Sequence, residues 1–167
     1  MTQASSEPNT IWLTQDAFDK LQAELENLKG PVRSEIVARI SAARDEGDLK
    51  ENGGYHAARE EQGKMEGRIR YLQELLRTAH VGDAPTADAV APGTVVTIYF
   101  EDDADDVETF LLGSREIAAT TELTVYSPES ALGNAILGAR AGESVTYSAP
   151  NGKDIKVTVV SFEPYPG

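Results

Sequence analysis

Residues 44–59, RDEGDLKENGGYHAAR, carry the side chains in this chain that are best suited to chemistry. Four carboxylates lie within this short segment: Asp45, Glu46, Asp48 and Glu51. Carboxylate oxygens are the protein ligands that Mg²⁺ prefers, with water and phosphate oxygens completing its shell. Asp48 and Glu51 are three residues apart, so they would share a face of a helical turn. Two carboxylates are too few for tight binding, so a metal held here needs further ligands from another molecule.

A purely structural role is the alternative for the same two acids. Asp48-x-x-Glu51 also has the spacing of a capping box, with Asp48 as the N-cap of a helix and Glu51 at its third position. Acidic residues at a helix start are favourable because of the helix dipole alone. His56 has Glu60 four residues later instead of a second histidine, and His80 stands alone, so both are expected to be solvated.

Two long helices are expected to position this segment. Thr14 is the predicted N-cap of the first helix, and Asp16 lies in its first turn. Gly30-Pro31 interrupts the pattern and is expected to kink the helix or loosen one turn. The apolar stripe of this helix consists of Phe18, Leu21, Leu25, Leu28, Val32, Ile36, Ile40 and Ala43.

The second helix repeats the same spacing of three and four residues. Its stripe consists of Tyr55, Ala58, Gln62, Met65, Ile69, Leu72, Leu76 and Ala79. Two narrow stripes with a short connection predict an antiparallel coiled-coil hairpin over residues 1–80, with its acidic tip at 45–52. At 1.5 Å per residue, about 30 residues give a rod of roughly 45 Å. A dimerisation or spacer device is the simplest use of such a rod.

The remaining chain predicts a linker and a second domain. Residues 81–93 are small residues with two prolines, which is typical of a linker. Residues 94–167 are expected to form an antiparallel sheet with one short helix, so the fold class is α+β with two domains. The predicted strands are 94–100, 107–113, 122–127, 144–149 and 155–162, and the predicted helix is 130–138.

Two loops of this second domain carry their own signals. Asn151-Gly152 favours a type I′ hairpin turn. The acidic residues of the 101–108 loop are expected to be solvated, with a docking patch for a basic partner as the alternative. They are Glu101, Asp102, Asp103, Asp105, Asp106 and Glu108.

Composition excludes several classes of protein. The formal net charge is −13, which argues against a protein that grips nucleic acid through its phosphates. The excess is uneven, with a balance of −3 over residues 1–80 and −10 over residues 81–167. The chain has no Cys, so disulfides and thiolate zinc sites are excluded. It carries neither a signal-peptide pattern nor an apolar run of membrane-spanning length, so we expect a soluble cytoplasmic protein.

The segment GDLKENGGYHAAREEQG at 47–63 resembles the signature of the bacterial Gre transcript cleavage factors, most closely the GreA branch of that family. The resemblance extends over nearly the whole chain, including Ser127-Pro128 and the following LGNAILGARAGE. It implies a coiled-coil domain followed by an FKBP-like domain. It also implies a hairpin that enters the secondary channel of RNA polymerase and stimulates cleavage of the 3′ end of a backtracked RNA.

The resemblance implies roles for individual residues. Asp48 and Glu51 match the tip carboxylates that help to hold the second catalytic Mg²⁺, so the polymerase would cut and this chain would not itself be an enzyme. Asn52 and Tyr55 match further motif positions and are expected to support the tip near the RNA end. Arg59 either shares that role or pairs with Asp45 or Glu51. Ser127 and Pro128 are the candidate polymerase contacts.

Three functions compete. The first is an elongation factor that acts on RNA polymerase as a monomer, with Mg²⁺ shared between the two proteins and short RNA products. The second is a peptidyl-prolyl isomerase, which rests only on fold analogy. The aromatic residues of that domain fall within predicted strands, which favours core packing. The third is a homologue that occupies the channel and inhibits, although Asp48 and Glu51 stand intact here.

Overall fold

The computed structural model describes residues 11–47, 51–84 and 86–166, which form two compact units. The hairpin unit is Phe18–Thr78, and the sheet unit consists of the described residues on either side of it. Within the described residues, no helix combines the length and the apolar character that crossing a membrane requires. The expected α+β class, with an N-terminal helical hairpin and a C-terminal sheet that carries one short helix, is confirmed.

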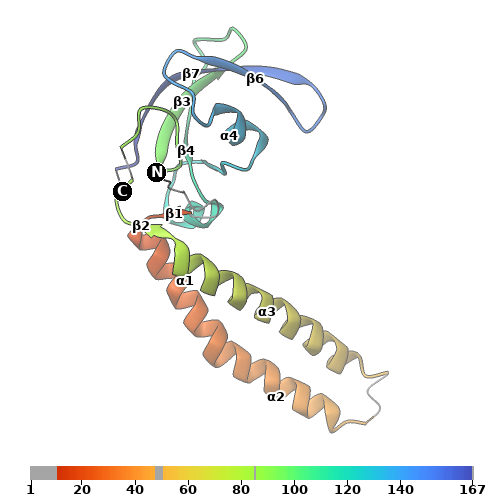
Figure 1. Ribbon diagram of the computed structural model, residues 1–167. Coiled ribbons are helices and arrows are strands. Elements are labelled where there is room, and N and C mark those ends of the chain that lie inside the picture. The colour runs from red at the N-terminus through yellow and green to blue at the C-terminus, as the bar shows by residue number, and fades with distance from the viewer. Residues whose placement is uncertain (1–10, 48–50, 85, 167) are drawn as a thin grey trace, which may run out of the picture. The chain divides into compact units, whose positions relative to one another are not determined.

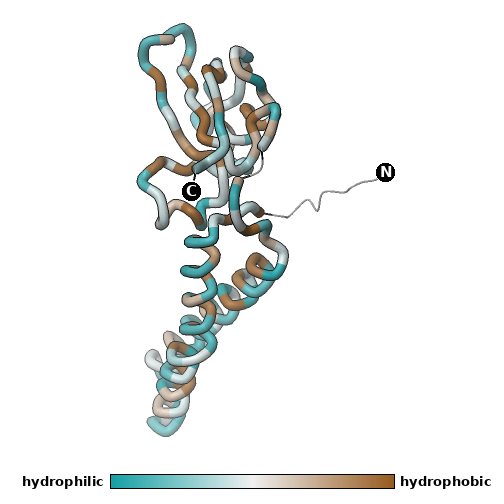
Figure 2. The backbone as a smooth tube through the Cα atoms, turned by 90° about the vertical axis from the view of Figure 1, so that its left-hand side faces the viewer, coloured by the Kyte–Doolittle hydropathy of each residue, from teal (hydrophilic) through white to brown (hydrophobic). Residues whose placement is uncertain are grey.

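The hairpin is built from α1 (Gln15–Asn27), a π-helical turn η1 (Leu28–Val32), α2 (Arg33–Arg44) and α3 (Gly53–Thr78) (Figure 1). Thr14 is the N-cap, as expected, because its Oγ1 accepts a hydrogen bond from Ala17 N at 3.1 Å. Apolar residues recur along both arms of the hairpin (Figure 2). The buried side chains of the two stripes are Leu21, Leu25, Ile36, Ile40, Ala43, Ala58, Met65, Ile69, Leu72 and Leu75.

Both stripes were predicted, with one difference near the end of α3. Leu75 is the buried side chain there, whereas Leu76 is half-buried. The stripe of the first arm advances by four residues at each step from Leu28 to Ile40, which overshoots the 3.6 residues of an α-helical turn. A π-helical turn contains more residues than an α-helical turn, so the turn at η1 keeps the apolar stripe on one face of the arm. Pro31 lies inside that turn, where its missing N–H would break an α-helical ladder.

Among the described residues of the hairpin, three ion pairs join its two arms. Arg33 binds Glu66 with two hydrogen bonds of 2.7 and 3.0 Å. Arg68 binds Glu24 in the same bidentate way, at 2.8 and 2.9 Å. Arg39 Nη2 lies 2.8 Å from a carboxylate oxygen of Glu61. Because each pair links a particular residue of one arm to a particular residue of the other, together they fix the register of the hairpin.

The larger sheet of the sheet unit has five described strands in the order β5-β4-β3-β7-β6. Their bounds are β3 Thr94–Phe100, β4 Glu108–Leu112, β5 Val125–Tyr126, β6 Ser144–Ser148 and β7 Asp154–Pro164. The prediction of a purely antiparallel sheet was wrong, because β4 and β5 are parallel. The chain between them forms the 3₁₀ helix η2 (Arg115–Thr120), and this crossover returns it in the same direction.

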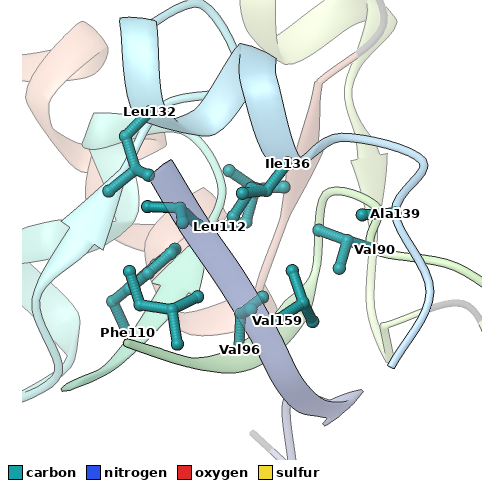
Figure 3. Packing of buried hydrophobic residues seen from close by; sticks show 10 residues of the cluster. Val90, Val96, Phe110, Leu112, Leu132, Ile136, Ala139 and Val159 are labelled. Carbon is teal, nitrogen blue, oxygen red and sulfur yellow. The ribbon is translucent and has the colours of Figure 1, made fainter. Parts of the chain in front are cut away.

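The core of the sheet unit lies between the sheet and α4 (Ala131–Ile136) (Figure 3). Leu132 and Ile136 of α4 project toward Phe110 and Leu112 of β4, and Val96 and Val159 extend the cluster along the neighbouring strands. The predicted linker contributes to this core. Val90 is 2 % exposed, and its backbone exchanges hydrogen bonds with Gly138 and Ala139.

The turn between β6 and β7 differs from the expected type I′ turn. Ala149 and Lys153 close a three-residue loop, and Gly152 N donates to Ala149 O at 2.8 Å. Gly152 has a φ of +85°, whereas Asn151 does not have a positive φ. A type I′ turn needs positive φ at both central residues. The loop is therefore a type I turn over residues 149–152 that ends in a glycine bulge at Gly152.

Two short strands without a sequence signal complete the sheet unit. Strand β1 (Trp12–Leu13) pairs in parallel with β2 (His80–Val81), in the register Trp12 with His80 and Leu13 with Val81. Both residues of β1 are buried. The segment before α1 is therefore part of the sheet unit, although it precedes the hairpin in sequence.

We predict opposite effects for one substitution at two glycines. Gly133→Ala should destabilise the sheet unit by about 1–3 kcal/mol, because an added Cβ would collide with Ser127 O. Gly63→Ala should stabilise the hairpin by about 0.5–1 kcal/mol, because Gly63 lies inside α3 with open space around it. Urea unfolding measures both, with Trp12 fluorescence for the sheet unit and helical circular dichroism for the hairpin. Unchanged stability in Gly133→Ala would contradict the packing at α4.

The Arg68–Glu24 pair predicts a dependence of hairpin stability on pH. The hydrogen bonds from Arg68 hold the pKa of Glu24 below its ordinary value of 4.5. The contribution of this carboxylate is therefore present above pH 4.5 and is lost as the pH falls through its lowered pKa. Because both side chains are about one-third exposed, we expect less than about 1 kcal/mol.

Glu24→Gln tests this dependence. Its hairpin should be less stable than that of the wild type at pH 7, and the difference should shrink as the pH falls through the lowered pKa of Glu24, as measured by urea unfolding with circular dichroism. Glu26→Gln is the matched control, because Glu26 accepts only a hydrogen bond from Gln22 among the described residues. A stability difference for Glu24→Gln that stays constant with pH would exclude the pair as its source.

Candidate functional site at the hairpin tip

The tip begins where α2 ends. Asp45 follows the last helical residue, Arg44, and Glu46 N donates to Ala43 O at 3.1 Å. Gly47 N donates to Arg44 O at 3.3 Å, and Gly47 has a φ of +122°. Residues with a side chain larger than hydrogen rarely adopt such a φ. Gly47 therefore allows the chain to leave α2 in this direction.

Asn52 closes the tip from the other side. Its Oδ1 accepts a hydrogen bond from Tyr55 N at 3.0 Å, which makes Asn52 the N-cap of α3. Its Nδ2 donates to Ala43 O, the last buried position of α2, at 2.6 Å. One half-buried side chain therefore starts α3 and ties that start to the end of α2. Asn52 was expected to support the tip, and the Asn-Gly-Gly sequence is the signal that could have indicated its capping bond.

The capping-box alternative for the two acids was wrong. Helix α3 begins at Gly53, so Glu51 lies before the N-cap and cannot occupy the third position of the helix. For the same reason, Glu51 is not in the helical turn that would place it on one face with Asp48. Asp48 itself lies outside the described residues. The spacing of the acids did not reveal that Asn52, three residues before Tyr55, is the N-cap of α3.

The described carboxylates of the tip are exposed to solvent. Asp45, Glu46 and Glu51 are exposed, and none of the three forms an ion pair with another described residue. No group of three or more metal-ligating side chains occurs among the residues that the structure describes. The donor set therefore fits Mg²⁺ in kind, because its oxygens are hard and accessible, but it fills only part of an octahedral shell.

Two other predicted tip residues lie on the first turns of α3. Tyr55 is half-buried, and its ring meets the ring of His56 edge-on at a centroid distance of 5.5 Å. Arg59 is exposed, and its Nη1 donates to Gln62 Oε1 at 2.9 Å. Arg59 therefore does not pair with Asp45 or Glu51, which was one of its two expected roles, and the other, a supporting role at the tip, stays a prediction. The bond to Gln62 holds the guanidinium along α3, on the side that leads away from the tip.

The candidate polymerase contacts lie in the turn before α4. Ser127 O accepts hydrogen bonds from Ser130 N at 3.0 Å and from Ser130 Oγ at 2.6 Å. Ser127 Oγ accepts a bond from Glu129 N, and Pro128 is half-buried. Both residues therefore shape the start of α4. A contact with a partner at this turn stays a prediction.

The acidic loop and the aromatic residues of the sheet unit follow the simpler expectations. Residues 101–108 are all exposed, and Lys156 is the cation that meets them, 3.5 Å from Asp102. Phe110 is 1 % exposed and packs edge-on against Tyr126 at 4.8 Å. Burial raises the pKa of Tyr147, whose ring packs against the same core. These rings build the core, which is the use that the strand pattern favoured.

Comparisons with known proteins agree over the whole chain. Residues 11–81 match the family described as "Transcription elongation factor, N-terminal", and residues 84–164 match "Transcription elongation factor, GreA/GreB, C-term". Transcription elongation factor GreA of Streptomyces coelicolor is 56 % identical over 168 residues, which span 100 % of both chains. The GreA protein of Saccharopolyspora erythraea is 59 % identical over 163 residues, which cover 97 % of this chain and 99 % of the relative.

A solved structure was also compared. The GreA factor homolog 1 (Gfh1) protein of Thermus thermophilus is 22 % identical, with a TM-score of 0.42, over 93 % of this chain and 99 % of that one. This likeness is too loose to carry an argument. The two domain matches and the full-length relatives do carry one. This chain belongs to the GreA/GreB family of transcription elongation factors.

Proposed function

We propose that this elongation factor inserts its helical hairpin into the secondary channel of RNA polymerase and stimulates cleavage of the 3′ RNA in backtracked complexes. In this proposal the polymerase is the nuclease, and the chain acts in trans as a monomer in the cytoplasm. The tip supplies Asp48 and Glu51 as ligands of a Mg²⁺ ion that the polymerase also binds. In the proposed complex, that ion would act on the RNA 3′ end.

The observation that carries this proposal is an incomplete set of metal ligands at the end of a braced rod. Helix α3 has 26 residues, so at 1.5 Å per residue it is about 39 Å long. The described acids at its tip are exposed and without ion-pair partners, while the three cross-arm pairs lie farther along the rod. A long, narrow support for a partial ligand set suits an active site that lies deep inside another protein.

Each tip residue has a separate task in this mechanism. Glu51 and Asp48 donate carboxylate oxygens, and a second Mg²⁺ supplies activation of the attacking water and charge stabilisation of the phosphodiester. Asn52 positions Glu51, because its bonds to Tyr55 N and Ala43 O fix the backbone next to that carboxylate. Tyr55 lies on the first turn of α3, from which it supports the RNA end, and Arg59 shares this role once its guanidinium leaves Gln62 and turns toward the tip.

The sheet unit docks the protein on the polymerase in this proposal. The turn at Ser127 and Pro128 is the contact that we propose, because its backbone is held rigidly by Ser130. We also propose short cleavage products. Arg33, Arg39 and Arg68 are engaged in cross-arm ion pairs, so they do not form an open basic track for long extruded RNA.

Removing either proposed metal ligand should abolish the stimulated cleavage. We predict that Asp48→Ala and Glu51→Ala each lower the cleavage rate by about 100-fold or more, because each removes a ligand that acts on the reacting phosphate. The measurement is the release of short 3′ fragments from labelled RNA in a stalled, backtracked complex of the cognate polymerase. Both variants should still compete with the wild type for the polymerase.

Asp45→Ala is the matched control for these variants. It removes a neighbouring exposed carboxylate of the same tip, and it should cleave within about 3-fold of the wild type, because Asp45 is assigned no ligand role. Equal losses in all three variants would mean that only the overall tip charge matters. Channel competition by the wild type without any acceleration of cleavage would instead favour the inhibitor alternative.

Asn52→Asp tests the positioning role of Asn52. Aspartate also caps a helix, so the bond from Tyr55 N is kept, but it cannot donate to Ala43 O. We predict that helix content is unchanged and that the maximal cleavage rate falls about 10-fold, because the loop next to Glu51 is no longer tied to α2. The concentration for half-maximal stimulation should stay the same. Wild-type cleavage in Asn52→Asp would show that the bond to α2 is dispensable.

A further inference from the structure

Trp12 fills a socket in the sheet unit that the elongation-factor function does not explain. The residue is 5 % exposed, and its Nε1 donates to Gly82 O at 3.1 Å. Its ring packs edge-on against Tyr165, with 6.0 Å between the ring centroids. A Cβ at Gly113 would lie 3.7 Å from Trp12 Cζ3, so the indole lies directly over the backbone there.

The strand that carries Trp12 holds the two ends of the hairpin together. His80 N donates to Ile11 O at 2.8 Å, and Gly82 N donates to Leu13 O at 3.1 Å. One residue, Thr14, separates β1 from α1, and one residue, Ala79, separates α3 from β2. Helix α1 therefore begins, and α3 ends, one residue from the same parallel ladder, and we call these two points the roots of the hairpin.

This ladder is too short to hold by itself. It joins two strands of two residues each, and a two-stranded sheet is marginal in water even when it is longer. The ladder also closes a long loop, because β1 and β2 are separated by the whole hairpin. Burial of the indole is the largest apolar contribution in β1, and the Nε1 bond to Gly82 reaches across the ladder to the chain just after β2.

We propose that Trp12 is a positioning residue that limits how far the hairpin can swing at its roots, and that cleavage depends on this limit. The activity part of this inference rests on the function proposed above. A tip that must bring carboxylates to a reacting phosphate loses rate steeply when its placement varies by about 1 Å. Loosening the roots therefore lowers the cleavage rate at saturation, while the docking contacts of the sheet unit are unchanged.

Two kinds of variant remove or displace the Trp12 indole from its buried position. Trp12→Ala removes the indole, and Gly113→Val pushes against it without altering β1. Gly113→Ala is the matched control for the valine variant, because its single methyl group meets Trp12 and Ile117 at ordinary contact distances of 3.7 and 3.5 Å. Trp12→Phe is the conservative variant, which keeps an aromatic ring in the socket and loses only the bond to Gly82.

The first measurement needs no polymerase. Trp12 is the chain's one tryptophan, so its emission wavelength and acrylamide quenching show directly whether Gly113→Val has unseated it. The chain also has no Cys, so Ala57→Cys and Ala141→Cys place one spin label on each unit at exposed positions. We expect a broader distance distribution in Trp12→Ala and Gly113→Val than in the wild type, Gly113→Ala and Trp12→Phe.

The second measurement separates positioning from folding and binding. Trp12→Ala and Gly113→Val should lower the maximal cleavage rate about 10-fold or more, while the half-maximal concentration changes less than about 3-fold. Trp12→Phe should restore most of the rate. Val157→Ala, which weakens the buried sheet core and leaves Trp12 in place, controls for lost stability and should keep the wild-type distance distribution.

Two results would overturn the inference. One is an unchanged distance distribution in Trp12→Ala and Gly113→Val, because the roots would then be held without the indole. The other is a broadened distribution with a wild-type cleavage rate. A wild-type protein that fails to stimulate cleavage would refute the proposed function instead, and the distance measurement would still decide whether Trp12 restrains the hairpin.

Discussion

The apolar seam between the two arms of the hairpin is the contact on which the tip depends. A rod of two helices has no surrounding core, so each buried side chain must pack against the opposite arm. Ile36, Ile40 and Ala43 on α2 are buried in this way, as are Ala58 and Met65 on α3. The cross-arm ion pairs add little energy at their exposure, but they select one register. Without that register, Asn52 could not reach Ala43 O.

Sequence patterns predicted the parts of this structure that repeat. The stripes gave the hairpin, and the strand at 94–100 was predicted with its observed bounds. The start of α3 was harder to predict, because Asp48-x-x-Glu51 and Asn52 offer competing caps within five residues, and the bond from Asn52 to α2 cannot be read from the sequence. The β1–β2 pair could not be predicted, because two-residue strands have no period and their partner lies across the hairpin. The same separation along the chain is why the sequence did not indicate the role proposed for Trp12.

The sequence names candidate residues for the site, but it does not indicate their geometry. Residue types and the family resemblance identified the acids, whereas the helix boundary shows that Glu51 belongs to the loop and not to a helical face. The position of a carboxylate on a loop is fixed only as well as the loop backbone that carries it. That backbone is fixed next to Glu51 by Asn52, so a capping residue influences where the Glu51 carboxylate lies. Side-chain identity alone could not reveal this coupling.

The tip carries more acidic residues than the stability of the hairpin explains. Glu51 precedes the start of α3, where a negative charge is favourable, but Asp45 and Glu46 follow the end of α2, where the helix dipole disfavours it. None of the three is compensated by an ion pair with a described residue. Folding of the hairpin alone would favour basic residues after α2. Negatively charged side chains at the end of the rod instead lower the free energy of a cation close to Glu51. The charges that weaken the isolated hairpin would therefore favour Mg²⁺ in the proposed complex, where a partner supplies the missing ligands.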